Sequence, residues 1–119
     1  RHLAGSKIKS FTATSIGGPT DGAVKEDKAS ITLTFEDGSF GTIHYLANGG
    51  KAFPKERIEV FSNDAVLQLD NFRKLEGFGW KGFKKDRLFK QDKGQAACTK
   101  AFVEAIRQGK PAPISFDEI

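Results

Sequence analysis

The fold is decided by residues 29–45, whose sequence is Ala29-Ser-Ile-Thr-Leu-Thr-Phe35-Glu-Asp-Gly38-Ser-Phe-Gly-Thr-Ile-His-Tyr45. Apolar and hydroxyl side chains alternate along residues 29–35, which is the period of a half-buried β-strand whose inner face carries Ile31, Leu33 and Phe35. The pair Asp37-Gly38 favours a tight hairpin turn, and residues 39–47 follow as the partner strand. This stretch therefore predicts an antiparallel hairpin.

Further strands are expected on both sides of that hairpin. Residues 7–16 alternate in the same way, and residues 17–28 are polar and indicate a loop. A second hairpin is expected across Ser62-Asn63-Asp64. Its strands, and two shorter ones that follow, are expected over residues 57–61, 65–69, 71–76 and 82–89.

Residues 93–108 change to a helical period. Cys98, Phe102, Ala105 and Ile106 share one face, which we expect to be buried, Gly109 follows as a cap, and Pro111 prevents continuation. The sequence thus predicts an α+β fold, with an open, mostly antiparallel sheet of about six strands and a helix packed on one face. One helix cannot cover both faces, so we expect the other face to meet a second copy of the chain through Thr12, Thr14, Thr32, Thr34 and Thr42.

Composition limits the class of protein. The 119 residues suit a single domain over 1–119, and the absence of Met predicts that the chain is a fragment of a larger protein. Cys98 is the only cysteine, which excludes an internal disulfide and favours a cytoplasmic location. No apolar run is long enough to span a membrane. Residues 73–93 carry eight Lys and Arg against three acidic residues, which points to an anionic partner or to a solvated basic hairpin.

The string Gly77-Phe-Gly79-Trp-Lys-Gly82 matches the dinucleotide-binding pattern G-x-G-x-x-G. That pattern needs a helix directly after it, whereas the residues that follow predict a strand or loop. We therefore expect a glycine-containing turn with aromatic side chains packed over the sheet, and no cofactor-binding residue. Two alternatives stay open for this segment: a solvated hairpin, or a site where Trp80 and Phe83 stack on a base or sugar while Lys81, Lys84, Lys85 and Arg87 meet phosphates.

The segment Asn48-Gly-Gly-Lys51-Ala-Phe53-Pro-Lys55 is the second candidate site, because adjacent glycines let a ligand approach the backbone and the lysines can bind hydroxyls or phosphate. Its alternative is a wide hairpin connection. His44 has no Asp or Cys at a catalytic or metal-ligating spacing, so a structural role is expected. No catalytic or metal-binding residue is predicted. The predicted substrate-binding residues are Asn48, Lys51, Phe53, Lys55, Trp80 and Lys81.

Four segments occur in an order that resembles the C-terminal domain of the glucose–fructose oxidoreductase/inositol dehydrogenase (Gfo/Idh/MocA) family. They begin at Arg1-His-Leu-Ala-Gly5, Ser30-Ile-Thr-Leu, Phe53-Pro-Lys-Glu and Phe102-Val-Glu-Ala. The resemblance implies the dihydrodipicolinate-reductase-like type of domain. It also implies a missing N-terminal Rossmann domain that binds NAD or NADP and acts as this domain's partner.

By resemblance, the parent enzyme is an NAD(P)-dependent dehydrogenase of sugars or nucleotide-sugars, and this domain binds substrate and forms a homo-oligomer through its sheet. The family's catalytic motifs, Glu-Lys-Pro and D-x-x-x-H, do not occur in this chain, so the fragment alone is expected to be inactive. Two alternatives are a stand-alone basic module for single-stranded nucleic acid, which is less favoured, and a purely structural oligomerisation domain.

Overall fold

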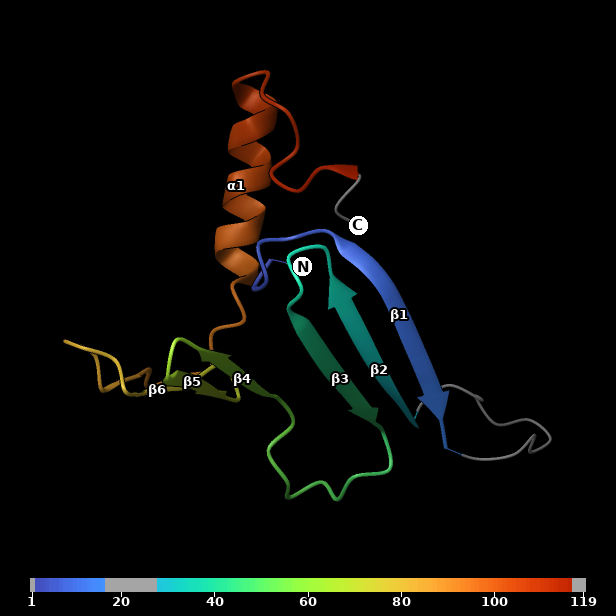
Figure 1. The fold of residues 1–119 in the computed structure, drawn as a ribbon. Coiled ribbons are helices and arrows are strands. Elements are labelled where there is room, and N and C mark those ends of the chain that lie inside the picture. Colours follow the sequence, from blue (N-terminus) through green and yellow to red (C-terminus); the bar gives the residue numbers. More distant parts are fainter. Residues whose placement is uncertain (1, 17–27, 117–119) are drawn as a thin grey trace. The chain divides into compact units, whose positions relative to one another are not determined.

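The computed structural model describes residues 2–16 and 28–116 (Figure 1). The chain divides into two compact units, Arg1–Gly50 and Lys51–Ile119. Most of the predicted loop over residues 17–28 and the acidic pair Asp117-Glu118 lie outside the described residues. The first unit contains three strands, β1 (Ile8–Ser15), β2 (Lys28–Phe35) and β3 (Phe40–Leu46).

The three strands form an antiparallel sheet in the order β1-β2-β3, as the alternation predicted (Figure 1). The turn between β2 and β3 has Gly38 at a φ of 87°, which a residue without a Cβ adopts at little cost. The Asp37 carboxylate accepts hydrogen bonds from the Ser39 backbone N–H at 3.0 Å and from its hydroxyl at 2.7 Å. These bonds lower the pKa of Asp37. The predicted hairpin is confirmed.

The register gives this sheet two chemically different faces. On one, which we call the hydroxyl face, Thr12, Thr32 and Thr42 form a row across all three strands. The Thr32 and Thr42 hydroxyl oxygens are 3.5 Å apart. The rows on either side add Ser10, Thr34 and Phe40, and Thr14, Ser30 and His44, so seven of the nine positions in the three rows carry hydroxyls. The five threonines predicted to face outward therefore share one surface.

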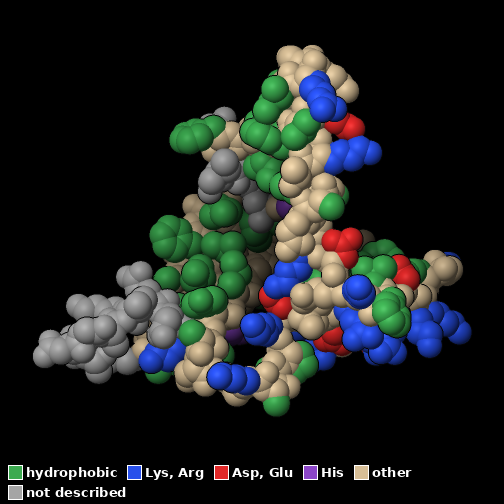
Figure 2. All heavy atoms as spheres, turned by 180° about the vertical axis from the view of Figure 1, so that it is seen from behind, with side chains coloured by type: hydrophobic (Ala, Val, Ile, Leu, Met, Phe, Trp, Pro, Cys, Tyr) green, Lys and Arg blue, Asp and Glu red, His purple; other side chains and the backbone are tan. Residues whose placement is uncertain are grey.

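The opposite face of the first sheet is apolar. Phe35 is buried there, but Phe11, Ile43 and Tyr45 are 70%, 50% and 59% exposed. Figure 2 shows hydrophobic side chains gathered over this sheet. Within residues 2–16 and 28–50 no helix covers this face. An apolar surface of this kind is typical of a face that another surface completes.

The second unit contains a four-stranded antiparallel sheet in the order β4-β5-β6-β7. The turn that joins its first two strands has Asn63 and Asp64 at φ angles of 48° and 58°. Positive φ at both central residues defines the turn type that matches the twist of a two-residue hairpin, so the predicted second hairpin is confirmed. The strands are β4 (Arg57–Ser62), β5 (Ala65–Asp70), β6 (Lys74–Phe78) and β7 (Lys85–Arg87).

This sheet also has two distinct faces. Its apolar face carries Ile58, Val60, Leu67, Leu69 and Leu75, all half-buried, beside the buried Ala65. We call the other side the charged face. Its members are Arg57, Glu59, Gln68, Asp70, Lys74, Glu76, Lys85 and Arg87, with Phe61, Val66 and Phe78 in the row at one end.

The helix α1 (Gln95–Arg107) starts after Gly94, which has a φ of 78°. Its place in the sequence was predicted, but its packing was not: α1 contacts none of β4–β7, and no residue of it is buried. The expected buried face is exposed, with Phe102 at 53% and Cys98 also accessible. The expectation that Cys98 is a core residue was therefore wrong, because no strand of the second unit lies against the helix.

The sheet arrangement also differs from expectation. In the part of the chain that the structure describes, seven strands form two separate sheets rather than one sheet of about six strands, since each sheet is built only from hairpins between consecutive strands. Among the described residues only Phe35 and Ala65 are hydrophobic and buried. The architecture is mostly antiparallel sheet with one helix, which confirms the α+β class in this coarse form.

Candidate functional site

The predicted loop follows β3 and is fully accessible. Asn48, Lys51 and Lys55 are exposed, and Phe53 is 77% exposed. The backbone N–H of Gly49 donates to the Leu46 carbonyl at 3.3 Å, which makes a turn directly after the strand. These four residues are reachable by a ligand, and their role as substrate contacts stays a prediction.

The G-x-G-x-x-G string lies on a hairpin. It begins on β6, turns through Gly79 and Gly82 at φ angles of 76° and 79°, and leads into β7. The expected strand–turn–strand is confirmed, and the strand-to-helix geometry of a dinucleotide fingerprint is not formed here. Lys81 is exposed in this turn.

The glycines of this hairpin make room for neighbouring groups. A Cβ on Gly77 would lie 2.7 Å from Phe83 Cδ1 and 3.2 Å from Trp80 Cδ1. The indole N–H of Trp80 donates to the Val66 carbonyl at 3.1 Å, and 39% of the residue is exposed. Because Gly77 belongs to the side of the sheet that carries Leu67, both rings pack over the apolar face. The expected packing of aromatics over a glycine-containing turn is confirmed.

The basic segment is divided by the sheet. Trp80 and Phe83 lie at the apolar face, whereas Lys85 and Arg87 belong to the charged face. The stacking rings and these two cations of the predicted nucleic-acid alternative therefore do not share a surface. Lys81 and Lys84 precede β7, and the Lys84 carbonyl accepts a hydrogen bond from the Gly77 N–H at 2.8 Å, next to the paired residues Glu76 and Lys85.

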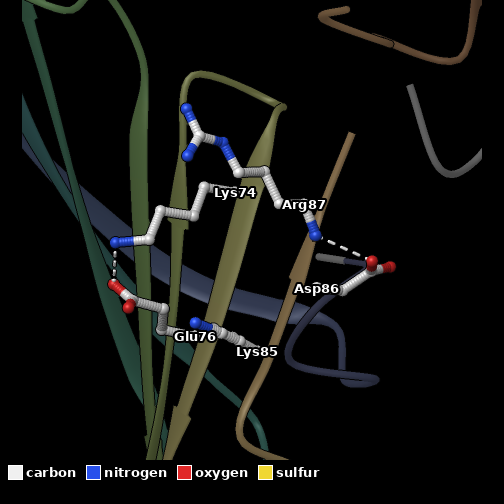
Figure 3. Close-up of a pocket in the computed structure, with 5 residues that line it drawn as sticks. All are labelled: Lys74, Glu76, Lys85, Asp86 and Arg87. Atoms are coloured by element: carbon white, nitrogen blue, oxygen red, sulfur yellow. Dashed lines mark hydrogen bonds and ion pairs between the residues drawn. The ribbon is translucent and has the colours of Figure 1, made fainter. Parts of the chain in front are cut away.

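The structure places a hollow of about 430 Å³ on the second sheet, at the β6–β7 pair, which the sequence did not predict. Lys74 lies opposite Arg87 in the ladder, and Glu76 lies opposite Lys85. Figure 3 shows these four side chains on one side of the strands, with Asp86 pointing away from them. The Asp86 carboxylate instead accepts a hydrogen bond from the Arg87 backbone N–H at 2.7 Å.

Charge within this hollow is unequal. Lys74 Nζ lies 2.6 Å from Glu76 Oε2. Among the residues that the structure describes, neither Lys85 nor Arg87 pairs with a carboxylate. Three cations and two anions, Glu76 and Asp86, therefore line the hollow, and among the described residues Lys85 and Arg87 form no ion pair with a carboxylate. The only sign of this hollow in the sequence was that charged residues stand two apart at positions 74 and 76 and at 85 and 87. That these four residues lie together becomes apparent only when the strand register is known.

Farther along the charged face, Asp70 joins neighbouring strands. Arg57 Nε lies 2.9 Å from Asp70 Oδ1, and Gln68 Nε2 donates to Asp70 Oδ2 at 3.0 Å. The hydrogen bond from the Arg57 guanidinium and the one from Gln68 lower the pKa of Asp70. The hydrogen bond with Asp70 also raises the pKa of Arg57. This part of the face is therefore internally neutralised, unlike the hollow.

A strained turn precedes β6. Asn71 and Phe72 both have a φ of 50°, which is uncommon for Asn and rarer for an aromatic residue. Gln91 Nε2 donates to the Asn71 carbonyl at 2.9 Å and to its side-chain oxygen at 2.8 Å. The Phe72 carbonyl accepts from Asp92 N–H at 3.0 Å, and the Lys93 ammonium lies 5.9 Å from the Phe72 ring centre. These contacts tie the segment before α1 to the strained turn.

Other candidate groups are isolated. His44 is exposed on β3, opposite Ser30. Within the two described ranges, no three His, Cys, Asp or Glu side chains are grouped so that they could hold a metal ion. The same ranges contain no helix with the length and apolar character that crossing a membrane requires.

Comparison of the chain with family models, with curated proteins and with solved structures finds no match. The resemblance drawn from the order of its sequence segments therefore stays a prediction.

Proposed function

We propose that this chain is the substrate-binding and dimerising domain of an NAD(P)-dependent sugar or nucleotide-sugar oxidoreductase. The observation that carries the proposal is the uncovered apolar face of the first sheet, where Phe11, Ile43 and Tyr45 are at least half exposed. A face of this composition needs a covering surface, and a cofactor-binding domain of the parent enzyme would supply it. The order of the sequence segments supports the same assignment.

In this proposal the domain contributes binding rather than proton or hydride transfer. The bound nicotinamide supplies the hydride chemistry. Lys51 and Lys55 donate hydrogen bonds to hydroxyl or phosphate oxygens of the substrate, since an ammonium group carries three donors and a positive charge. Asn48 and Phe53, on the same exposed loop, contact the remainder of the ligand.

The test uses the longest reading frame that contains this chain. We expect the purified protein to reduce NAD or NADP in the presence of a sugar or nucleotide-sugar, monitored by the absorbance of the reduced nicotinamide. Lys51→Gln and Lys55→Gln should raise the KM for substrate, while the exposed Lys110→Gln should leave it unchanged. A protein that binds no nicotinamide nucleotide would refute the assignment. Tight binding of NAD by the 119-residue chain alone, measured by calorimetry, would also contradict the assignment of cofactor binding to another domain of the parent enzyme.

A second candidate, an oligomerisation domain without a ligand, is favoured by the hydroxyl face. Seven of the nine positions in its three rows are Ser or Thr, the other two being Phe40 and His44, and neutral hydroxyls can be buried against their own copy in mutual hydrogen bonds. Sedimentation should then show a dimer that Thr32→Lys dissociates. Thr99→Lys, on α1, is the matched control. A monomer at every concentration would remove dimerisation from both proposals.

A further inference from the structure

The hollow on the charged face is the part of the molecule that the proposed function leaves unused. None of its lining residues is among the predicted substrate contacts. Lys74, Lys85 and Arg87 direct three cationic groups to the same side of the β6–β7 pair as the Glu76 carboxylate, while Asp86, the second acidic residue of the lining, points its side chain away (Figure 3). A ligand of this hollow therefore does not depend on the parent protein being an oxidoreductase.

The cross-strand pairing of Lys74 with Arg87 is unfavourable by itself. Residues directly opposite in an antiparallel ladder have Cβ atoms about 5 Å apart, and like charges at this distance repel. Glu76 takes the Lys74 ammonium at 2.6 Å, but Arg87 and Lys85 keep no carboxylate partner in residues 28–116. An anion placed between them would neutralise both. A guanidinium is well suited to hold two oxygens of one phosphate group.

A second feature lies on the same face. Phe61 on β4 and Phe78 on β6 flank Val66 in the end row and are 74% and 54% exposed. Phe78 lies two residues from Glu76 and four from Lys74, which corresponds to about 7 Å and about 13 Å along the strand. Exposed aromatic rings at this spacing from a cationic cluster can stack on a flat ring whose phosphates reach the cations.

We propose that the charged face binds a nucleoside diphosphate, with Lys74, Lys85 and Arg87 holding the phosphates and Phe78 stacking on the base. The ligand class follows from both parts of the surface together: the cations select phosphate, and the aromatic row selects a ring attached to it. Glu76 orients Lys74 and keeps the site from being uniformly positive.

The test is calorimetric titration of the 119-residue chain with two probes, inorganic pyrophosphate and uridine diphosphate, at low ionic strength. We expect both to bind and uridine diphosphate to bind about tenfold more tightly, because it adds one stacked base. Arg87→Gln and Lys85→Gln should each weaken both probes by about tenfold. Phe78→Ala should weaken uridine diphosphate alone and bring it to the affinity of pyrophosphate.

Matched controls exist for each variant. Arg107→Gln and Lys110→Gln remove the same charges elsewhere, and Phe102→Ala removes a ring that is 53% exposed on α1, compared with 54% for Phe78. All the substituted side chains are exposed, and circular dichroism verifies that each variant is folded.

Three results would overturn the proposal. The first is that neither probe binds at millimolar concentration, which would mean that the charges of β7 only protect a sheet edge from pairing with another strand. The second is that Arg87→Gln weakens pyrophosphate no more than Arg107→Gln does. The third is that a short single-stranded oligonucleotide binds far more tightly than uridine diphosphate, which would assign the face to nucleic acid. Equal affinity for pyrophosphate and uridine diphosphate would show that the base is not bound, and would contradict its stacking on Phe78.

Discussion

Replacing Gly79 by Ala tests how the β6–β7 hairpin is packed. A Cβ at this position would lie 2.7 Å from the Asp64 carbonyl oxygen and 3.2 Å from the Ala65 Cα. Both atoms belong to the backbone of the β4–β5 turn, so neither can move away by a side-chain rotation. Ala65 is also 8% exposed, so a shift of this turn disturbs one of the few buried positions. The substitution therefore forces two turns of the sheet apart.

The magnitude has two parts. Gly79 has a φ of 76°, and an alanine in that left-handed region costs about 1 kcal/mol. The steric overlap with the neighbouring turn adds about 2 kcal/mol, within the range for inserting a methyl group into a packed site. We expect Gly79→Ala to lower the free energy of unfolding by about 3 kcal/mol.

Gly82 supplies the control from within the same G-x-G-x-x-G string. Its φ is 79°, almost equal to that of Gly79, but a Cβ there meets nothing within 4 Å. Gly82→Ala should therefore lower the free energy of unfolding by only about 1 kcal/mol. The difference between the two variants isolates the contact with the β4–β5 turn from the cost of the backbone conformation.

The assay is urea unfolding monitored by tryptophan fluorescence. Trp80 is the only tryptophan in the chain, and its indole N–H is bonded to the Val66 carbonyl, so its emission reports on this hairpin. The free energies of unfolding are obtained by linear extrapolation to zero urea with the same m-value for both variants. If the two variants lose the same stability to within about 0.5 kcal/mol, the close approach of the two turns is not present and the packing argument fails.

Three further predictions concern single side chains. Arg57→Gln should raise the pKa of Asp70 toward its ordinary value, as followed by NMR titration, because the hydrogen bond from the guanidinium is the main cause of its lowering. Because the pKa of Asp70 is lower in the folded state than in the unfolded state, the ionised carboxylate stabilises the fold above the unfolded-state pKa, and this stabilisation is lost as the pH falls through the folded-state pKa. A pKa of Asp70 that the substitution leaves unchanged would exclude the Arg57–Asp70 ion pair. Gln91→Ala removes both hydrogen bonds to Asn71 and should lower the urea stability by about 1 kcal/mol, whereas no loss would show that these bonds do not hold the strained turn. Cys98 should react with a thiol reagent in the native chain nearly as fast as in urea, and strong native protection would indicate that another surface covers α1.

Much of the strand structure was predictable because its signals are local. The alternation over residues 29–35 and the pair Asp37-Gly38 determined β2 and its turn without reference to distant residues. The same holds for the second hairpin, where Asn63 and Asp64 accept positive φ angles. The threonines expected to share a face do so, since residues two apart on a strand point to the same side.

What was missed depends on contacts between segments. The charged face appears only when the register places Lys74 opposite Arg87 and Glu76 opposite Lys85, and no local pattern specifies that register across the 79–84 turn. An apolar stripe on residues 98–106 predicts a helix, but it does not say which surface covers that helix. The positive φ of Phe72 belongs to the tight turn between β5 and β6, which a hydrogen bond from the Arg73 N–H to the Asp70 carbonyl closes at 3.0 Å. An aromatic residue is not a turn signal, so this turn could not be read from the sequence, and its contacts with Gln91, Asp92 and Lys93 come from about 20 residues later.

The two-residue connection at Asn63 and Asp64 has an evolutionary consequence. Because side chains alternate with a period of two, one extra residue there would slide β5 against β4 by one position if the two-residue turn were kept, and would exchange its inward and outward side chains. Leu67 and Leu69 would then point to the side now occupied by Gln68 and Asp70. A homologue with one more residue here must consequently change to a three-residue turn to keep the two faces of the sheet.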